Sequence, residues 1–445
     1  MMNQAGSLLG IGFSDPFMVG MIGLCFMFLL VLAGVRIVFA AAVTGLLGLV
    51  ELLGWGPAAG IVGTIPHSKS STYALSVLPM FIFIGFLAFH AGITQQLFEA
   101  ARKWLGWVPG GLAVATVMAT AGFAAVSGAS TATAAVFSRV AIPEMLRAGY
   151  DKRLAAGVVA AGGTLATLIP PSAILVIYAI IVEESVGALL LAGFLPGIVS
   201  ALVYAGIIVV WALYRPNQAP RGEKSTLSEK VASLPGISPI LLVVAIIMTS
   251  IYYGWATPTE AGALGAMVVF ILALMKGTRT RTIGQALMES AKLTAMIFSL
   301  IWGVLIFVRF LGFSGLPEAF TEWIVNLDAP PIMIMICILL AYSLLGMFMD
   351  AIGMLLLTLP VVYPAVIALG YDSIWFGIIV VKMAEVCLIT PPIGLNCFVV
   401  NGVRPDISLG QVFHGITLFF VADVITIALL LAFPEIVTWL PNLMR

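Results

Sequence analysis

The strongest constraint on this chain is that its sequence contains the same pattern twice. Ala148-Gly-Tyr-Asp151 recurs as Leu369-Gly-Tyr-Asp372, and Ile169-Pro-Pro171 recurs as Thr390-Pro-Pro392. Both pairs share an offset of 221 residues (370 minus 149 and 391 minus 170). A common offset between distant motifs indicates a duplicated structural unit. We therefore predict two homologous halves.

Composition places both halves in a lipid bilayer. Hydrophobic residues make up 62% of the 445 residues and charged residues only 9%, with a mean hydropathy of +1.16. Soluble domains carry about 25% charged residues. The formal net charge is zero, so no nucleic acid partner is expected. We predict an all-α polytopic membrane protein, because helices satisfy their own backbone groups in lipid.

Charged loops give the topology. Residues 1–214 and 237–445 form the two halves, and the polar, proline-containing stretch 215–236 is predicted to be a cytoplasmic linker. Short loops rich in Lys and Arg lie in the cytoplasm. An odd number of crossings inverts the second half, as in many secondary transporters. About ten crossings are predicted, five in each half, at 17–35, 37–53, 78–98, 154–182 and 189–214, and at 239–253, 261–275, 293–312, 374–403 and 412–431.

Two stretches do not fit as simple crossings. Residues 110–143 lie between basic loops and span about 50 Å as helix, which is too long for one crossing and too short for two. A re-entrant hairpin that enters from the cytoplasm and turns at 127–131 satisfies both length and charge. The corresponding stretch of the second half, 331–364, would enter from outside and turn at 346–353. The two tips are expected to meet near the membrane midplane.

Two predicted crossings are interrupted helices. Residues 154–182 and 374–403 are long, and each contains a double proline, which removes backbone donors and obstructs the helix. Irregular backbone at membrane depth occurs where it is buried in protein or lines a watery cavity. Free carbonyls in such breaks suit a cation, and the N-termini of half-helices suit an anion. The breaks therefore predict a buried site for sodium and a small carboxylate.

Polar residues at the breaks and tips are the candidate ligands. Asp350 is the strongest charged candidate, and Arg309 could contact a substrate, because charges in membrane segments default to functional hypotheses. Lys382 and Glu385, at i and i+3, are predicted to pair, and Asp423 to bond between helices. The remaining candidate substrate-binding residues are Thr131, Pro170, Pro171, Ser172, Gly353, Pro391, Pro392 and Asn396.

The sequence resembles the large membrane subunit of TRAP (tripartite ATP-independent periplasmic) transporters, within a superfamily of sodium-coupled ion transporters. The resemblance covers essentially the whole chain. It rests on the motifs Phe98-Glu-Ala-Ala-Arg-Lys-Trp-Leu105, Pro109-Gly-Gly-Leu-Ala-Val-Ala-Thr116, Ser127-Gly-Ala-Ser-Thr-Ala-Thr-Ala134, Pro143-Glu-Met145, Ala161-Gly-Gly-Thr164, Leu168-Ile-Pro-Pro-Ser172, Thr257-Pro-Thr-Glu-Ala-Gly262, Gly346-Met-Phe-Met-Asp350 and Thr390-Pro-Pro-Ile-Gly-Leu-Asn396.

The resemblance implies an elevator-type symporter in the bacterial inner (cytoplasmic) membrane. It implies a small four-helix membrane subunit and a periplasmic substrate-binding protein as partners, and a small organic acid as substrate. It also implies Na⁺ as the coupling ion. Two departures from the family pattern, Ala129 for Ser and Ala166 for Gly, could shift solute preference. The implied sodium sites match Ser127, Gly128, Ser130 and Ile169 at the first tip and break, and Gly346, Asp350 and Thr390 at the second.

Three other functions compete with this interpretation. A stand-alone sodium-carboxylate symporter of the same superfamily would need no binding protein. An intramembrane protease would need a Ser-His pair or a motif such as His-Glu-x-x-His, and the sequence offers neither, so no enzyme is expected. A channel needs a continuous water path, whereas hairpins that close a site from opposite sides favour alternating access.

Overall fold

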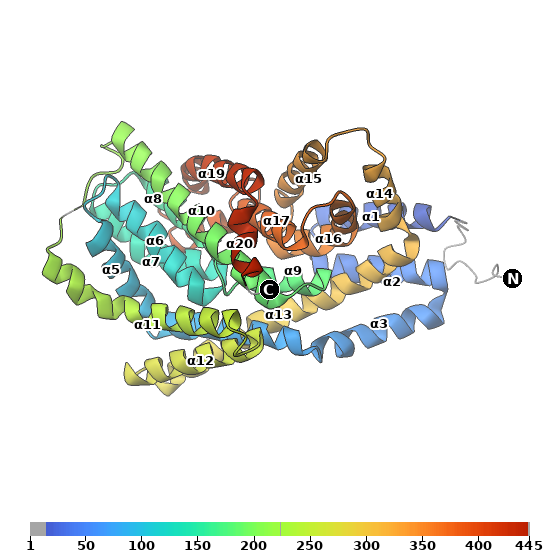
Figure 1. Ribbon diagram of the computed structural model, residues 1–445, viewed down its shortest axis with the longest axis horizontal. Helices are drawn as coiled ribbons and strands as arrows, with labels where there is room; N and C mark the ends of the chain where they lie inside the picture. The colour runs from blue at the N-terminus through green and yellow to red at the C-terminus, as the bar shows by residue number, and fades with distance from the viewer. Residues whose placement is uncertain (1–14, 223, 444–445) are drawn as a thin grey trace.

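The computed structural model describes residues 15–222 and 224–443, and in them all regular structure is helical (Figure 1). The first half comprises α1 (Pro16–Leu32), α2 (Ile37–Leu53), α3 (Trp55–Ser70), η1 (Tyr73–Ser76), α4 (Val77–His90), α5 (Ile93–Leu105), α6 (Gly111–Ser127), α7 (Ser130–Arg147), α8 (Lys152–Thr164), η2 (Leu165–Thr167), α9 (Ala173–Val182) and α10 (Val186–Tyr214).

The second half repeats the succession of helices seen in the first. α16 begins 221 residues after α7 (351 minus 130), and α17 begins 221 residues after α8 (373 minus 152). The duplicated sequence thus corresponds to duplicated helices. The second half comprises α11 (Leu227–Tyr252), α12 (Pro258–Met275), α13 (Thr280–Ser314), α14 (Leu316–Val325), α15 (Pro331–Gly346), α16 (Ala351–Ala368), α17 (Ser373–Cys387), α18 (Leu395–Val403), α19 (Leu409–Ala432) and α20 (Glu435–Asn442).

The length and hydropathy of the helices indicate that the protein lies in a membrane. Among the described residues, seven helices are long and apolar enough to cross a bilayer, and five shorter helices are also apolar. Large apolar side chains such as Leu29, Leu213 and Leu340 are more than half exposed. Such exposure suits a lipid environment, because lipid is the medium that accepts apolar surface without penalty.

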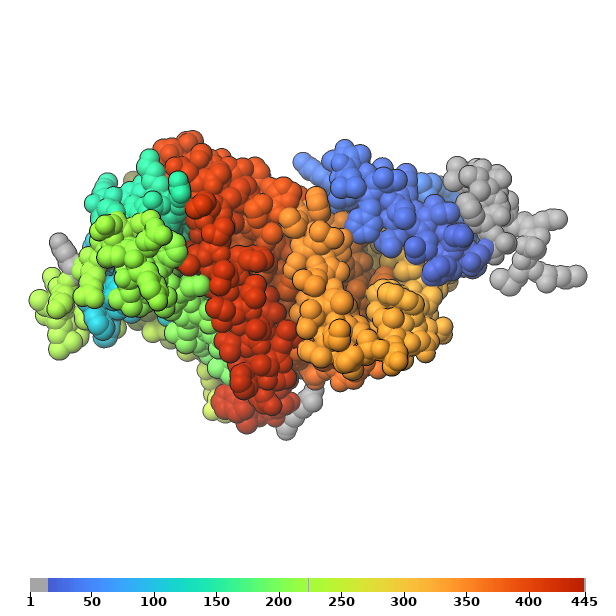
Figure 2. All heavy atoms as spheres, turned by 90° about the horizontal axis from the view of Figure 1, so that it is seen from above, coloured from blue at the N-terminus to red at the C-terminus, as the bar shows by residue number. Residues whose placement is uncertain are grey.

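The two interrupted helices form the centre of the molecule. All residues from Leu154 to Ala179, which cover α8 to α9, are buried, and so are all residues from Ile374 to Ile389. A helix that is apolar on every side belongs in an interior. α19 packs on α8 and α10, and Figure 2 shows the C-terminal segment, in red, crossing the face between the green and the orange segments.

The hairpin turns and helix breaks lie where the sequence places them. α6 ends at Ser127 and α7 begins at Ser130, inside the expected turn at 127–131. α15 and α16 are separated by 347–350, inside the expected turn at 346–353. α8 is separated from α9 by η2 and residues 168–172, and α17 from α18 by 388–394.

The expected crossing at 78–98 is present, but its bounds differ, because the apolar span covers Tyr73–His90. α4 ends at His90, and Gly92, with φ of 71°, starts a separate helix, α5. The apolar run of α4 continues into an amphipathic helix whose Phe98 is buried and whose Arg102 and Lys103 lie near its end. The expected crossing runs too far because it includes the first residues of α5, whose apolar Leu97 and Phe98 lie on the buried face of that helix. In the second half, residues 316–323 match residues 97–104 in sequence and form part of α14.

Other boundaries also differ from the sequence prediction. α11 begins at Leu227, inside the stretch 215–236 expected to be linker, because Thr226 and Glu229 form a capping box there. α13 runs for 35 residues and includes the expected crossing at 293–312. α3 was not anticipated, since Pro66, His67 and Lys69 make its sequence less apolar than that of its neighbours. α14 and α20 were also missed.

Candidate functional site

The first break exposes backbone carbonyls inside the protein. Ser172 caps α9, accepting a hydrogen bond from the Leu175 amide at 3.5 Å and donating one to the Thr167 carbonyl. Pro170 and Pro171 have no backbone N–H to offer. Within the part of the chain that the structure describes, the carbonyls of residues 169–171 accept no hydrogen bond. Buried carbonyls are normally paired, so these oxygens are available to a cation.

The tip of the first hairpin packs directly on this break. Gly128 has φ of 57°, and a Cβ atom placed on it would lie 2.5 Å from the Pro171 carbonyl oxygen. Only glycine allows this approach. Thr133 donates to the Ala129 carbonyl at 2.9 Å, so the Ser127 hydroxyl is the donor in its 2.9 Å hydrogen bond to Thr133. The lone pairs of the Ser127 oxygen therefore remain free.

The second tip is arranged around a carboxylate. Asp350 is half-buried, caps α16 and accepts a hydrogen bond from the Gly353 amide at 3.2 Å through Oδ2. Gly346 lies against Cys387 at the end of α17. The Thr390 hydroxyl donates to the Val386 carbonyl at 2.7 Å. The structure thus places the second tip beside the second break, as in the first half.

The two breaks differ in exposure. Residues 168–172 of the first break are all buried. In the second break Pro391, Pro392 and Ile393 are exposed, and Thr390 is half-buried. Each contains a cis peptide bond between its two prolines. Repeat-related sites therefore have different access from outside the protein in this conformation.

Asn396 connects the second break to the first tip. Its amide nitrogen donates to Ser130 Oγ at 2.8 Å and to the Ala160 carbonyl at 3.0 Å, and the side chain is fully buried. The expectation that the two tips meet is not what this geometry shows. Among the described residues no hydrogen bond joins the tips, and α18 of the second half reaches the first tip instead.

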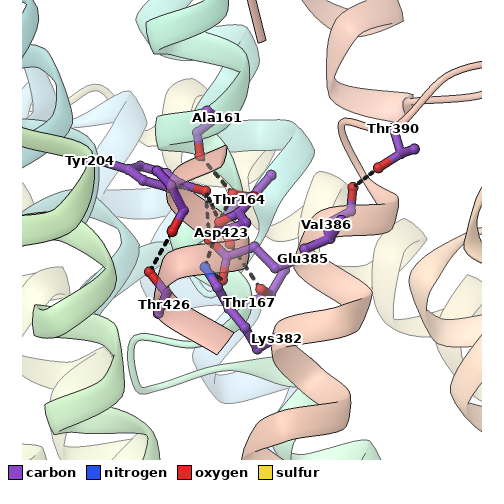
Figure 3. A network of polar contacts seen from close by, with 11 residues as sticks. Ala161, Thr164, Thr167, Tyr204, Lys382, Glu385, Val386, Thr390, Asp423 and Thr426 are labelled. Carbon is purple, nitrogen blue, oxygen red and sulfur yellow. Dashed lines mark hydrogen bonds and ion pairs between the residues drawn. The ribbon is translucent and has the colours of Figure 1, made fainter. Parts of the chain in front are cut away.

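A fully buried charged cluster lies beside both breaks (Figure 3). Lys382 Nζ lies 2.7 Å from Asp423 Oδ1 and 3.1 Å from Glu385 Oε2. All three side chains have no exposed surface. The predicted i,i+3 pair on α17 is confirmed, and so is the interhelical role of Asp423, which lies on α19.

Two uncharged residues complete the charged cluster, and sequence reasoning did not assign them to it. Tyr204 of α10 donates to Asp423 Oδ1 at 2.6 Å and approaches Glu385 Oε1 at 3.4 Å. Thr164, at the end of α8, donates to Glu385 Oε1 at 2.9 Å. A polar residue inside the apolar run of α10 was the only signal for Tyr204. These side chains come from α8, α10, α17 and α19, and Figure 3 shows them converging on one another.

A cavity of about 220 Å³ reaches the first tip from its other side. Ser127 and Ala129 line it, together with Arg139 of α7, and Gly85 of α4 packs against Ser127. Glu289 of α13 also lines it, and its Oε2 atom lies 3.1 Å from His90 Nε2. Arg139 is exposed and was not among the residues expected from sequence.

Arg309 is not brought to either tip. It lines a different cavity, of about 600 Å³, together with Lys69 and Glu183. Thr131 is half-buried next to Ser130, and its hydroxyl makes no hydrogen bond with other described residues. No cluster of three or more His, Cys, Asp or Glu residues occurs in the described ranges, so the site offers hydroxyl, carbonyl and single carboxylate oxygens.

Known proteins provide an independent comparison. The model of the family described as "Tripartite ATP-independent periplasmic transporter, DctM component" matches residues 17–436. A C4-dicarboxylate TRAP transporter large permease protein from Pseudomonas aeruginosa is 35% identical over 84% of this chain and 85% of its own length. A sialic acid TRAP transporter large permease protein from Vibrio cholerae is 29% identical over 83% and 87%.

Structural comparison extends to a solved transporter. The crystal structure of the YdaH transporter from Alcanivorax borkumensis aligns with a TM-score of 0.57, covering 86% of this chain and 90% of that chain. Sequence identity is 14%, so the likeness concerns the fold alone. The two proteins share a fold over that part of the chain.

Proposed function

The chain belongs to the tripartite ATP-independent periplasmic transporter family, as its DctM component, and from this premise we propose that it takes up a small organic acid anion by sodium-coupled alternating access. Membership of the family implies a small membrane subunit and a periplasmic binding protein as partners in general. In our proposal, the binding protein delivers the anion to this chain in the bacterial inner membrane. The observation that carries the proposal is the pairing of each hairpin tip with a helix break.

An anionic substrate suits the charges at the first tip. α9 and α18 begin at the breaks, so the positive ends of their helix dipoles lie beside the tips. Arg139 adds a full positive charge to the cavity that reaches Ser127. Relatives carry names that refer to C4-dicarboxylates and sialic acid, which are both organic acids. The substrate class proposed is therefore a small carboxylate.

Sodium suits the oxygen atoms of the two sites. Sodium is a hard cation and takes oxygen ligands, as Ca²⁺ and Mg²⁺ do. The first site would use Ser127 and the carbonyls of the first break, which accept no hydrogen bond among the described residues. The second would use Asp350 and the carbonyls that follow Thr390. These are the residues expected from the family resemblance, and the donor set fits the ion.

Unequal exposure of the breaks supports alternating access. A carrier must close its site toward one side while it is open to the other. Here the first break is buried and the second is partly exposed. In an elevator mechanism, the hairpins and broken helices would slide as one body against α4 and α13, which contact them.

Reconstituted uptake tests this function. Proteoliposomes would hold the chain with the small subunit, with the genome-neighbour binding protein outside and a panel of labelled C4-dicarboxylates and sialic acid. We expect uptake that requires both an inward sodium gradient and the binding protein. Sodium-driven uptake without the binding protein would identify a stand-alone symporter instead. Equilibration that ignores the gradient would overturn sodium coupling.

A further inference from the structure

The charged cluster of Lys382, Glu385 and Asp423 has an unbalanced charge. Two carboxylates and one ammonium group sum to minus one when all are ionised. Their side chains are completely buried, and no other Lys, Arg or His forms an ion pair with them in the described ranges. An uncompensated charge in an apolar interior carries a large free-energy penalty, which such groups avoid by binding a proton or a cation.

Two buried carboxylate oxygens of the cluster are poorly compensated. Asp423 Oδ2 has no hydrogen-bond partner, and the one partner of Glu385 Oε2 among the described residues is Lys382 Nζ at 3.1 Å, which also pairs with Asp423. Aromatic rings occupy the surroundings: the Tyr204 ring lies 5.3 Å from that of Phe419, and Lys382 Nζ lies 5.4 Å from the Tyr204 ring. Packing of this kind favours the smallest ligand.

We propose that this cluster is a proton-binding site in which Glu385 is protonated while Lys382 and Asp423 remain an ion pair. Asp423 is the closer partner of Lys382, because its Oδ1 receives the two shortest contacts of the cluster, from Lys382 at 2.7 Å and Tyr204 at 2.6 Å. Glu385 is less well compensated. Its ion pair with Lys382 measures 3.1 Å, and its other oxygen accepts only from hydroxyls.

The groups that face Glu385 come from every helix around it. Lys382 lies on its own helix α17, Asp423 on α19, Tyr204 on α10, and α8 contributes the uncharged Thr164. Thr164 precedes the first break, and Glu385 precedes the second. Release of the proton would therefore place a negative charge beside both breaks. The proton site goes beyond sodium coupling and links pH to both halves of the molecule.

Infrared difference spectroscopy tests this proton directly. Purified protein at neutral pH should show a carbonyl stretching band of a protonated carboxylic acid that disappears in Glu385→Gln. The matched control is Glu144→Gln, because Glu144 is partly exposed and paired with Arg147, and this variant should retain the band. The measurement does not depend on transport. The carboxylic acid band can therefore be absent while sodium-coupled uptake is observed, or present while that uptake is absent.

A second variant distinguishes charge balance from misfolding. Asp423→Asn leaves one ammonium group and one carboxyl, so Glu385 should ionise and the same band should be lost although Glu385 is present. Absence of a Glu385-dependent band at neutral pH would overturn the proposal. So would a band that appears only when sodium is replaced by a large organic cation, because that result would assign the cluster to sodium.

Discussion

Replacing Gly128 with Ala should weaken sodium binding by forcing the first tip away from the first break. Gly128 has φ of 57°, in the left-handed region. An added Cβ atom would lie 2.5 Å from the Pro171 carbonyl oxygen. The substitution adds a single methyl group and changes no charge, so its effect would report the contact between tip and break.

Two costs combine in Gly128→Ala. The left-handed conformation costs an L-residue roughly 1–2 kcal/mol. The carbon-to-oxygen contact must also lengthen toward about 3.3 Å, the short end of ordinary C···O contacts. Together these costs destabilise the sodium-bound state by about 2 kcal/mol. Because each factor of ten in affinity corresponds to about 1.4 kcal/mol, the affinity for sodium should fall roughly 30-fold.

The assay is the sodium dependence of uptake in proteoliposomes, with the half-saturating sodium concentration as the readout. We expect it to rise roughly 30-fold in Gly128→Ala. Gly206→Ala is the matched control, because Gly206 lies within α10 and nothing occupies the space its Cβ would fill. A half-saturating concentration equal in Gly128→Ala, Gly206→Ala and the parent protein would refute the reasoning.

Three further predictions follow from the same structure. Lys382→Met should lower the free energy of unfolding by about 3–5 kcal/mol, since it leaves the buried Asp423 carboxylate without a counter-charge; an unchanged thermal unfolding midpoint in detergent would contradict this. Asp350→Asn keeps a side chain that can cap α16 but removes the charge, so uptake should lose sodium dependence while thermal stability changes little; normal sodium dependence would exclude Asp350 as a ligand. Arg139→Gln should slow uptake of a dicarboxylate at least tenfold, about 1.4 kcal/mol, whereas Arg147→Gln should not; equal rates would remove Arg139 from the anion path.

Local rules placed the functional backbone correctly. Double prolines at residues 170–171 and 391–392 predicted the breaks, because proline cannot continue the helical ladder. The small residues at 127–131 predicted the first turn, and Gly128 occupies the left-handed position there. Both features depend on a few neighbouring residues, which is why sequence alone suffices for them.

Features that depend on tertiary contacts were harder to predict. The turn at Gly92 joins the apolar α4 to the amphipathic α5, whose buried face carries Leu97 and Phe98, so a crossing drawn from apolar residues alone runs past the turn. Tyr204 enters the charged cluster only because α10 packs against α17 and α19. Arg139 is separated in sequence from the cavity wall that Glu289 provides. The periodicity of a single helix does not predict such contacts between distant segments.

The hydrogen bonds of Asn396 have a thermodynamic consequence. Its amide ties Ser130 of the first hairpin to α18 of the second half, with partners at 2.8 and 3.0 Å. Any displacement of α18 when the second site is filled therefore also acts on Ser130 at the first site. Because energetic coupling between two sites is reciprocal, filling of the first site must change the affinity of the second by the same factor. Asn396 would thus make sodium binding cooperative, and a Hill coefficient above one should fall toward one in Asn396→Ala.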